Sequence, residues 1–346
     1  MAAPLRHQRQ QETFMTFTRR FSRRAAIGAL VSALLAGAGA PVWAAGSADA
    51  WPEKPVRMVV PFPPGGPGDI VARSLAEQLR QTWGQPVLVE NRPGASGTIG
   101  TANVARAEPD GYTVLLAAAS HVMNPSMFPK LPFDPVEDFT PIARIAGYPM
   151  AVLVNASLPY QSLDELVAAV KREPGTIAVA NTGAGSAPQL AAVLFEQRAG
   201  VQFLHIPYQG SGPTALALLS GEIKVNFQGS IALEQVRAGK LRALAITGEQ
   251  RLPDFPDVPT IAELGYPGYK VELWYGVLAP AGLVPEVRDR MYRDIQRAMA
   301  TDAVKTQLKG AGIMTEDLGP DAFRQSMQEE VAHWASVIEK AGITPQ

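Results

Sequence analysis

The sequence predicts an α/β fold, in which strands and helices alternate along most of the chain. Short runs rich in β-branched residues recur between segments that have one apolar face, and Gly/Pro-rich breaks separate them. Repeated strand–helix units imply a mostly parallel sheet with helices on both of its faces. The predicted strands cover 56–60, 87–89, 112–117, 143–154 with a break at 148–149, 177–180, 201–206, 223–228, 241–247 and 271–280.

The helices are predicted from apolar spacing and from capping residues. Ser162 and Glu165 have the spacing of a capping box, and four apolar residues spaced by four, from Val287 to Met299, form one helix face. Five prolines between residues 124 and 141 predict a segment rich in loops. The predicted helices cover 70–82, 162–171, 189–199, 214–220, 230–237, 303–308 and 320–341, with others at 104–105 and from 285 onward.

The first 44 residues have the pattern of a secretory signal peptide. Four arginines at positions 19, 20, 23 and 24 precede an apolar run over 25–40, and small residues around Ala44 supply a cleavage pattern. The arginine pairs partly match a twin-arginine signal, and an ordinary signal with extra arginines is the alternative. Met15 is an alternative start. We therefore expect an exported protein.

Charge and cysteine content exclude several function classes. Removing residues 1–44 takes away six arginines and one glutamate, so the formal charge changes from −1 to −6. An acidic chain is a poor partner for nucleic acid and for anionic membrane surfaces. The absence of cysteine excludes disulfides, thiolate nucleophiles and iron–sulfur clusters.

One stretch, VVPFPPGGPGDIVAR at 59–73, organises the prediction of function. It is typical of a strand end followed by a rigid Gly/Pro loop and a helix start, with Asp69 in the position of an N-cap. Such a junction directs unpaired backbone N–H groups and the positive end of a helix dipole at one place, which favours an anion. A plain turn between strand and helix is the alternative. The stretch matches neither a Walker A loop nor GxGxxG.

A second junction of the same kind, NTGAGSAP at 181–188, follows more than a hundred residues later. Ser186 is not placed between glycines as a nucleophile elbow requires. Two glycine loops at helix starts in two regions suit the capture of an anion between two lobes better than catalysis. An enzyme acting on small acids is the less favoured alternative.

The histidines do not indicate a metal site. No two of them have the spacing of metal ligands. His121, just after Ser120, follows a predicted strand at the edge where open α/β sheets bind ligands, so it either lines a pocket or lies in the core. We expect no cofactor and no metal.

Many motifs in order carry a family resemblance. They include PFPPGGPGDIVAR, VENRPGASGTIG, ARAEPDGYTVLL, FDPVEDFTPIARI, ANTGAGSAPQLAAVLF, IPYQGSGPTALALLSGEIKVNF, AGKLRALAITGEQR, DVPTIAELGYPGY, WYGVLAPAG and EEVAHWASVIEKAGI. Over 51–346 the chain resembles the solute receptors of tripartite tricarboxylate transporters, also called the Bug family.

The resemblance implies a periplasmic two-lobed binding protein of the Venus-flytrap type, type II-like, each lobe a mostly parallel sheet flanked by helices. One lobe would comprise 51–149 and 276–346, the other 150–275. The cleft would hold a small carboxylate between a loop at 62–69 and a loop at 181–187. The partners would be the membrane permease subunits of such a transporter, or alternatively a sensor kinase, and the receptor would be a monomer.

Two departures from the family pattern bear on the ligand. Gln189 replaces a histidine found in many relatives, and Gln228 stands where relatives often have an acidic residue. Without that carboxylate we expect an acid without an ammonium group, a di- or tricarboxylate or an aromatic acid. The predicted ligand-binding residues are Phe62, Gly65, Gly66, Asp69, Ser120, His121, Thr182, Gly185, Ser186, Ala187, Tyr208 and Gln228.

Their expected roles differ. Ser120, Thr182 and Ser186 would donate hydrogen bonds through their hydroxyl groups. Phe62 and Tyr208 would supply apolar walls, or alternatively belong to the core. Asp69 is better suited to capping the helix than to contacting an anion, because two like charges would repel.

Overall fold

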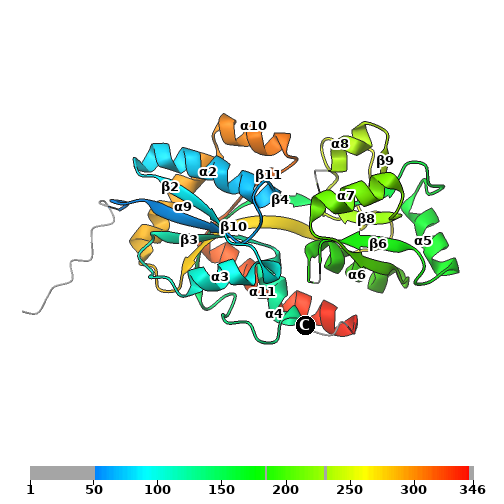
Figure 1. Cartoon of the computed structure of the whole chain (residues 1–346), viewed down its shortest axis with the longest axis horizontal. Helices are drawn as coiled ribbons and strands as arrows, with labels where there is room; N and C mark the ends of the chain where they lie inside the picture. Colours follow the sequence, from blue (N-terminus) through cyan, green and yellow to red (C-terminus); the bar gives the residue numbers. More distant parts are fainter. Residues whose placement is uncertain (1–50, 184, 230–231, 343–346) are drawn as a thin grey trace, which may run out of the picture. The chain divides into compact units, whose positions relative to one another are not determined.

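The structure is a computed structural model that describes residues 51–183, 185–229 and 232–342 (Figure 1). The predicted signal peptide lies outside the described residues. Among the described helices, none combines the length and the apolar character needed to cross a membrane. The described residues belong to one compact unit of the chain.

The first of two sheets has six strands in the order β11-β4-β10-β3-β1-β2. The strands β1 (Val56–Val60) and β3 (Thr113–Ala118) are parallel to each other, and the edge strand β2 (Val87–Asn91) is parallel to β1. The strands β4 (Phe139–Pro149) and β10 (Glu272–Pro280) form a long antiparallel pair, with β11 (Met314–Leu318) at the edge.

The second sheet has five strands in the order β7-β6-β8-β5-β9. The strands β6 (Ala178–Asn181), β7 (Leu204–Pro207) and β8 (Val225–Gln228) are parallel. The strand β5 (Ala151–Asn155) pairs antiparallel with β8 on one side and with β9 (Leu241–Ile246) on the other. The chain therefore enters this sheet directly after β4, at the predicted break in the strand over 143–154.

The α/β class with flanking helices is confirmed, but each sheet is mixed rather than mostly parallel. The strand–helix units β1-α2-β2 and β6-α6-β7 are parallel as predicted. The strands that link the two sheets, β4 and β10, run in opposite directions because the chain leaves the first sheet through one and returns through the other (Figure 1). All nine residues of β10 pair in the first sheet, starting at Glu272.

Helices cover both faces of each sheet. In Figure 1, α2 (Pro67–Trp83) and α10 (Asp302–Gly310) lie above the first sheet, and α3 (Thr98–Ala105), α4 (Ser120–Met127) and α11 (Pro320–Lys340) lie below it. The helix α9 (Pro285–Met299) packs with α2, and η1 (Ala95–Gly97) precedes α3. The helices that flank the second sheet are α5 (Leu163–Arg172), α6 (Ala187–Ala199), α7 (Ser211–Ser220) and α8 (Leu233–Arg237).

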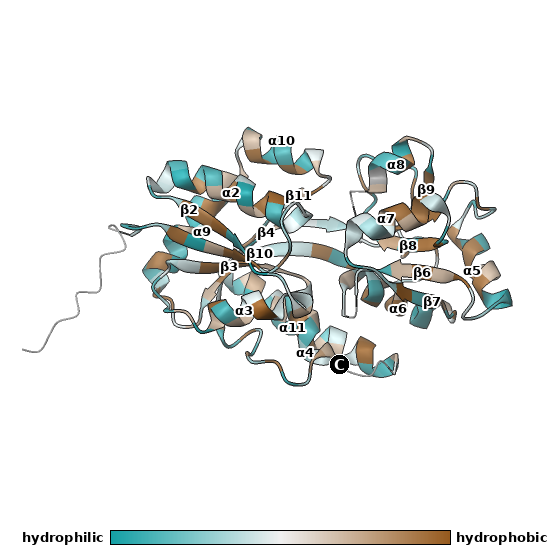
Figure 2. Ribbon diagram, in the orientation of Figure 1, coloured by the Kyte–Doolittle hydropathy of each residue, from teal (hydrophilic) through white to brown (hydrophobic). Residues whose placement is uncertain are grey.

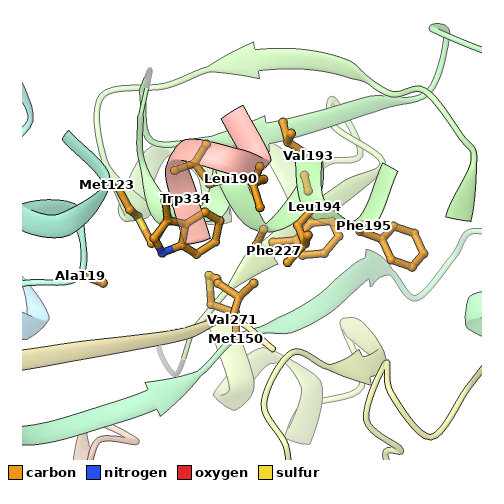
Figure 3. Close-up of a cluster of buried hydrophobic side chains, with 14 of the residues drawn as sticks. Ala119, Met123, Met150, Leu190, Val193, Leu194, Phe195, Phe227, Val271 and Trp334 are labelled. Carbon is orange, nitrogen blue, oxygen red and sulfur yellow. The ribbon is translucent and has the colours of Figure 1, made fainter. Parts of the chain in front are cut away.

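The hydrophobic core follows this layering. Figure 2 shows apolar residues concentrated on the strands, while the outer helices α2, α5 and α10 carry hydrophilic residues. One buried cluster extends from α4 and α11 to α6, and Figure 3 shows Trp334 beside Met123 and Leu190. Gln197 of α6 also donates a hydrogen bond to the carbonyl of Val337 in α11, at 2.7 Å. The helices of the two sheets therefore share part of their core.

Local signals located the start of α5 but missed the helix α4 and the strand β11. Ser162 accepts a hydrogen bond from the N–H of Glu165 at 3.2 Å, as its capping position predicts. The segment predicted as rich in loops, 124–141, overlaps the second half of α4, because the buried Val122, Met123 and Met127 stabilise a short helix despite its internal proline. The edge strand β11 is mostly polar, and only its pairing with β4 identifies it.

Candidate functional site

The first junction lies between β1 and α2. Gly65 has a φ of +82°, a conformation that glycine adopts without strain, and Gly66 is the N-cap of α2, with no side-chain hydrogen bond to the helix. The prediction that Asp69 is the N-cap is wrong, because α2 begins at Pro67 and Asp69 lies in its first turn. Proline at the first position needs no N–H partner, so the helix starts at Pro67, three residues before its apolar pattern begins at Ile70.

Asp69 holds the loop in place from inside the helix. Its carboxylate accepts hydrogen bonds from the N–H of Gly65 at 3.0 Å, from Arg73 at 2.9 Å and from the amide of Asn91 at 3.0 Å. Burial raises the pKa of Asp69, but the hydrogen bonds from Arg73, Gly65 and Asn91 together outweigh burial and lower the pKa below its usual value. The amide of Asn91 also donates to the carbonyl of Phe62 at 3.1 Å. This carboxylate is therefore engaged within the protein.

A strained segment supports the first junction from the side. Ala95 and Ser96 have left-handed φ angles of 45° and 53°, which are uncommon for residues other than glycine. Gly97 and Gly100 lie against Pro61, where a Cβ on Gly100 would come within 3.0 Å of the proline ring. Asn124 of α4 donates a hydrogen bond to the carbonyl of Ser96 at 3.1 Å.

Asn124 is a candidate that the sequence did not indicate. It is buried, and among the described residues its Oδ1 atom has no hydrogen-bond partner. The sequence indicated Asn124 only through its position after the strand β3, which ends at the same edge of the sheet as the first junction.

His121 lies in the core on α4, not at the end of a strand. Its Nε2 atom lies 2.8 Å from the carbonyl oxygen of Pro135, and its ring stacks on Phe133 and meets the edge of Phe139. Burial lowers the pKa of His121 to about 4, so the ring is neutral at physiological pH. Ser120 is the first residue of α4 and is half-buried.

The second junction lies between β6 and α6. Asn181 accepts a hydrogen bond from the N–H of Gly183 at 3.0 Å, and Gln189 accepts one from the N–H of Gly185 at 2.8 Å. Ser186 is the N-cap of α6, yet its hydroxyl makes no bond to the helix and, among the described residues, has no partner although it is buried. Thr182 is half-buried, and Ala187 is buried as the first residue of α6.

Two predicted residues of the second sheet have partners within the protein. Gln228 is buried; its amide donates to the carbonyl of Ser211 at 2.8 Å and accepts from Asn226 at 3.1 Å. The hydroxyl of Tyr208 donates to Glu222 at 2.8 Å. Gln228 therefore fixes the start of α7, and the ring of Tyr208 stays half-buried at the same edge of the sheet.

The helix α4 connects the two junctions. Asn124 bonds the segment that packs on Pro61. One turn later, at the last residue of α4, Met127 lies against Gly185, whose added Cβ would come within 3.0 Å of the Met127 side chain. Contacts of this one helix thus reach the segment beside the first junction and the loop before α6, which belong to different sheets. The starts of α2 and α6 both direct unpaired N–H groups and a positive dipole end outward, so the arrangement can bind an anion.

Charged side chains are scarce around the two helix starts. Of the predicted site residues only Asp69 has a charge, and Arg73 pairs with it. Among the described residues there is no group of three or more histidine, aspartate or glutamate side chains that could hold a metal ion. The donors available to an anion are backbone N–H groups and hydroxyls.

A surface cavity of about 460 Å³ lies elsewhere, between β4, β11, α9 and α10. Its polar rim is largely paired: Asp317 accepts hydrogen bonds from Tyr292 at 3.0 Å and from Gln296 at 2.6 Å. No predicted site residue lines it.

Comparison with known proteins assigns the family. Residues 71–343 match the model described as the tripartite tricarboxylate transporter family receptor. The chain belongs to this receptor family. It is 40% identical to Protein BugT of Bordetella pertussis over 310 residues, which are 89% of this chain and 94% of BugT.

Solved receptors share the fold. The periplasmic binding protein BugD is 37% identical, with a TM-score of 0.76, and the match covers 86% of this chain and all of BugD. MatC from Rhodopseudomonas palustris, solved with bound malate, is 33% identical with a TM-score of 0.75, covering 83% of this chain and all of MatC. The family and these relatives consist of binding proteins, so the chain is a solute-binding receptor rather than an enzyme.

Proposed function

We propose that this receptor is periplasmic and captures a small carboxylate without an ammonium group between the starts of α2 and α6. The observation that carries the proposal is the hydroxyl of Ser186. It is buried at the N-cap of a 13-residue helix and has no partner among the described residues. Because an unpaired buried hydroxyl costs free energy, a ligand oxygen that fills this role would be bound favourably.

The charge distribution supports an acid rather than an amino acid. An ammonium group needs a carboxylate partner, and the predicted site residues contain only one, that of Asp69. Three donors already engage this carboxylate. Gln228, at the end of β8, carries no charge. The malate bound to MatC, a dicarboxylate without an ammonium group, is consistent with this ligand class.

Thermal unfolding of the purified protein tests the proposal. The protein would be denatured and refolded to remove any retained ligand, and then screened with malate, succinate, adipate, citrate, benzoate, aspartate and glutamate. A ligand at a hundred times its dissociation constant stabilises the folded state by about 2.7 kcal/mol, which raises the melting temperature. Calorimetry would confirm each hit. Tight binding of an amino acid, or the absence of any carboxylate hit, would contradict the proposal.

We further propose that residues 1–44 are a signal peptide and that 51–149 with 276–346, and 150–275, form the two lobes that close on the ligand. Mass spectrometry of the protein from a periplasmic extract would give the mature N-terminus, which we expect near residue 45.

The proposed partner is the permease of a tripartite tricarboxylate transporter. Deleting the gene should then abolish uptake of the radiolabelled ligand. Intact uptake, together with loss of a transcriptional response to the ligand, would instead favour docking on a sensor kinase.

A further inference from the structure

Two tyrosines lie where the strands β4 and β10 connect the sheets. Tyr148 pairs in register with Leu273, and Tyr275 pairs with Ala146, so the two tyrosines are diagonal neighbours on one face of the sheet. Their ring centroids are 6.4 Å apart, with 35° between the ring planes. Besides burial, a hydrogen bond between the two phenols contributes to the pKa shifts of both tyrosines: it lowers the pKa of Tyr148 and raises the pKa of Tyr275.

Tyr275 contacts the start of α2, and Tyr148 contacts the end of β8 in the second sheet. Gly68, in the first turn of α2, leaves room for the ring of Tyr275, since a Cβ there would lie 3.1 Å from the ring and 3.4 Å from Phe62. Gly229, directly after β8, leaves room for Tyr148, since a Cβ there would lie 2.1 Å from the ring. The pair therefore forms a continuous contact from the start of α2 to the second sheet.

The chemistry of the pair suits a neutral hydrogen-bond donor. Burial raises the pKa of Tyr148 to about 12 and raises the pKa of Tyr275 well above its usual value, so both phenols keep their protons at physiological pH. Two phenols have two protons, and a bond between them uses one. Among the described residues, neither hydroxyl donates to a carbonyl or a carboxylate. At least one proton is available to an acceptor.

We propose that Tyr148 and Tyr275 form the floor of the ligand site and that a phenol proton binds the second carboxylate of a dicarboxylate. The proposal rests on the function proposed above, in which the first carboxylate binds at the helix starts. Without an unpaired cation among the predicted site residues, a second carboxylate needs a strong neutral donor, and a phenol is one. The pair thus determines specificity for dicarboxylates over monocarboxylates.

Calorimetry with acids of equal chain length tests this. The probes are the dicarboxylate that gives the largest thermal shift, from malate, succinate and adipate, and the monocarboxylate of the same length, such as butyrate for succinate. Tyr148→Phe and Tyr275→Phe each remove one hydroxyl. At least one of them should weaken dicarboxylate binding by about 5- to 30-fold and leave monocarboxylate binding unchanged.

Tyr269→Phe is the matched control. Its hydroxyl donates to the carbonyl of Ala191 at 2.8 Å within the core, so its loss should lower the melting temperature without changing the ratio of the two affinities. A second test keeps both hydroxyls: Gly229→Ala should displace the ring of Tyr148 and reduce dicarboxylate affinity selectively. Gly212→Ala, with open space around its Cβ, is the control for that change.

The outcomes separate the two proposals. Equal weakening of both acids, or no weakening in either tyrosine variant, overturns the role of the pair. A wild-type protein that binds monocarboxylates alone overturns it as well and leaves the carboxylate receptor in place. A wild-type protein that binds no carboxylate overturns the proposed function itself.

Discussion

The two junctions start helices in the same way but are held by different chemistry. At the first, the ionised Asp69 binds the loop, Arg73 and Asn91. At the second, the neutral amides of Asn181 and Gln189 bind the loop. The N-cap of α2 is Gly66, which has no side chain, and the hydroxyl of Ser186 makes no bond to α6. Both helix starts are therefore open to a ligand. A binding site of this kind can thus be built with or without a titratable group.

The largest expected effect is on pH dependence, because only the first junction and its support on α4 contain titratable groups. The pKa of His121 is about 4 in the folded state against 6.5 in its usual range, so the unfolded chain binds more protons between these values. The contribution of the neutral His121 ring to the free energy of unfolding is fully present above pH 6.5 and is lost as the pH falls toward 4. Since each unit of pKa difference corresponds to about 1.4 kcal/mol, the contribution of His121 amounts to about 3 kcal/mol.

Urea unfolding from pH 7 to pH 4 checks this. His121→Asn should flatten the pH dependence between 6.5 and 4, whereas the control His205→Asn, outside both junctions, should retain it. An unchanged slope in His121→Asn would show that other groups cause the acid sensitivity.

The next effect comes from removing the charge at the first junction. Asp69→Ala removes three hydrogen bonds and should lower the free energy of unfolding at pH 7 by about 2–3 kcal/mol, less than a fully buried ion pair because Arg73 is half-exposed. Gln189→Ala at the second junction should cost about 1 kcal/mol, since it removes one neutral bond. Chemical denaturation of both variants measures the difference, and equal losses would contradict the comparison.

A smaller change separates binding from stability. Ser186→Ala removes a hydroxyl that has no partner among the described residues, so the melting temperature of the free protein should stay the same or rise. Ligand affinity should fall by about 5- to 30-fold in calorimetry. Ser157→Ala, on an exposed turn, is the control for both measurements. A destabilised Ser186→Ala protein would mean that the hydroxyl has a structural role.

A final comparison uses one glycine from each loop. Gly185 has a φ of +71° and lies against Met127, so Gly185→Ala should cost about 1–2 kcal/mol in stability. Gly66 has a φ of −83° and an open Cβ position, so Gly66→Ala should be close to neutral. Thermal unfolding of the two variants measures both, and a neutral Gly185→Ala would show that the second loop can rearrange.

Local sequence determined the parts of this protein that depend on neighbouring residues. The strand–loop–helix order of both junctions and the Ser162 cap were predicted because glycine, proline and capping residues act within a few positions of themselves. The family could be inferred from the sequence as well, because its motifs occur in order over almost the whole chain.

Tertiary structure decided what depends on residues far apart in the chain. Asn91, which is 22 residues away in the chain, donates a hydrogen bond to Asp69 and makes this carboxylate an anchor for the loop, and α4 forms because the core stabilises it. The contact between Tyr148 and Tyr275 joins residues more than a hundred positions apart. Propensity and spacing act over short distances, whereas strand pairing and burial bring together groups that no local pattern connects.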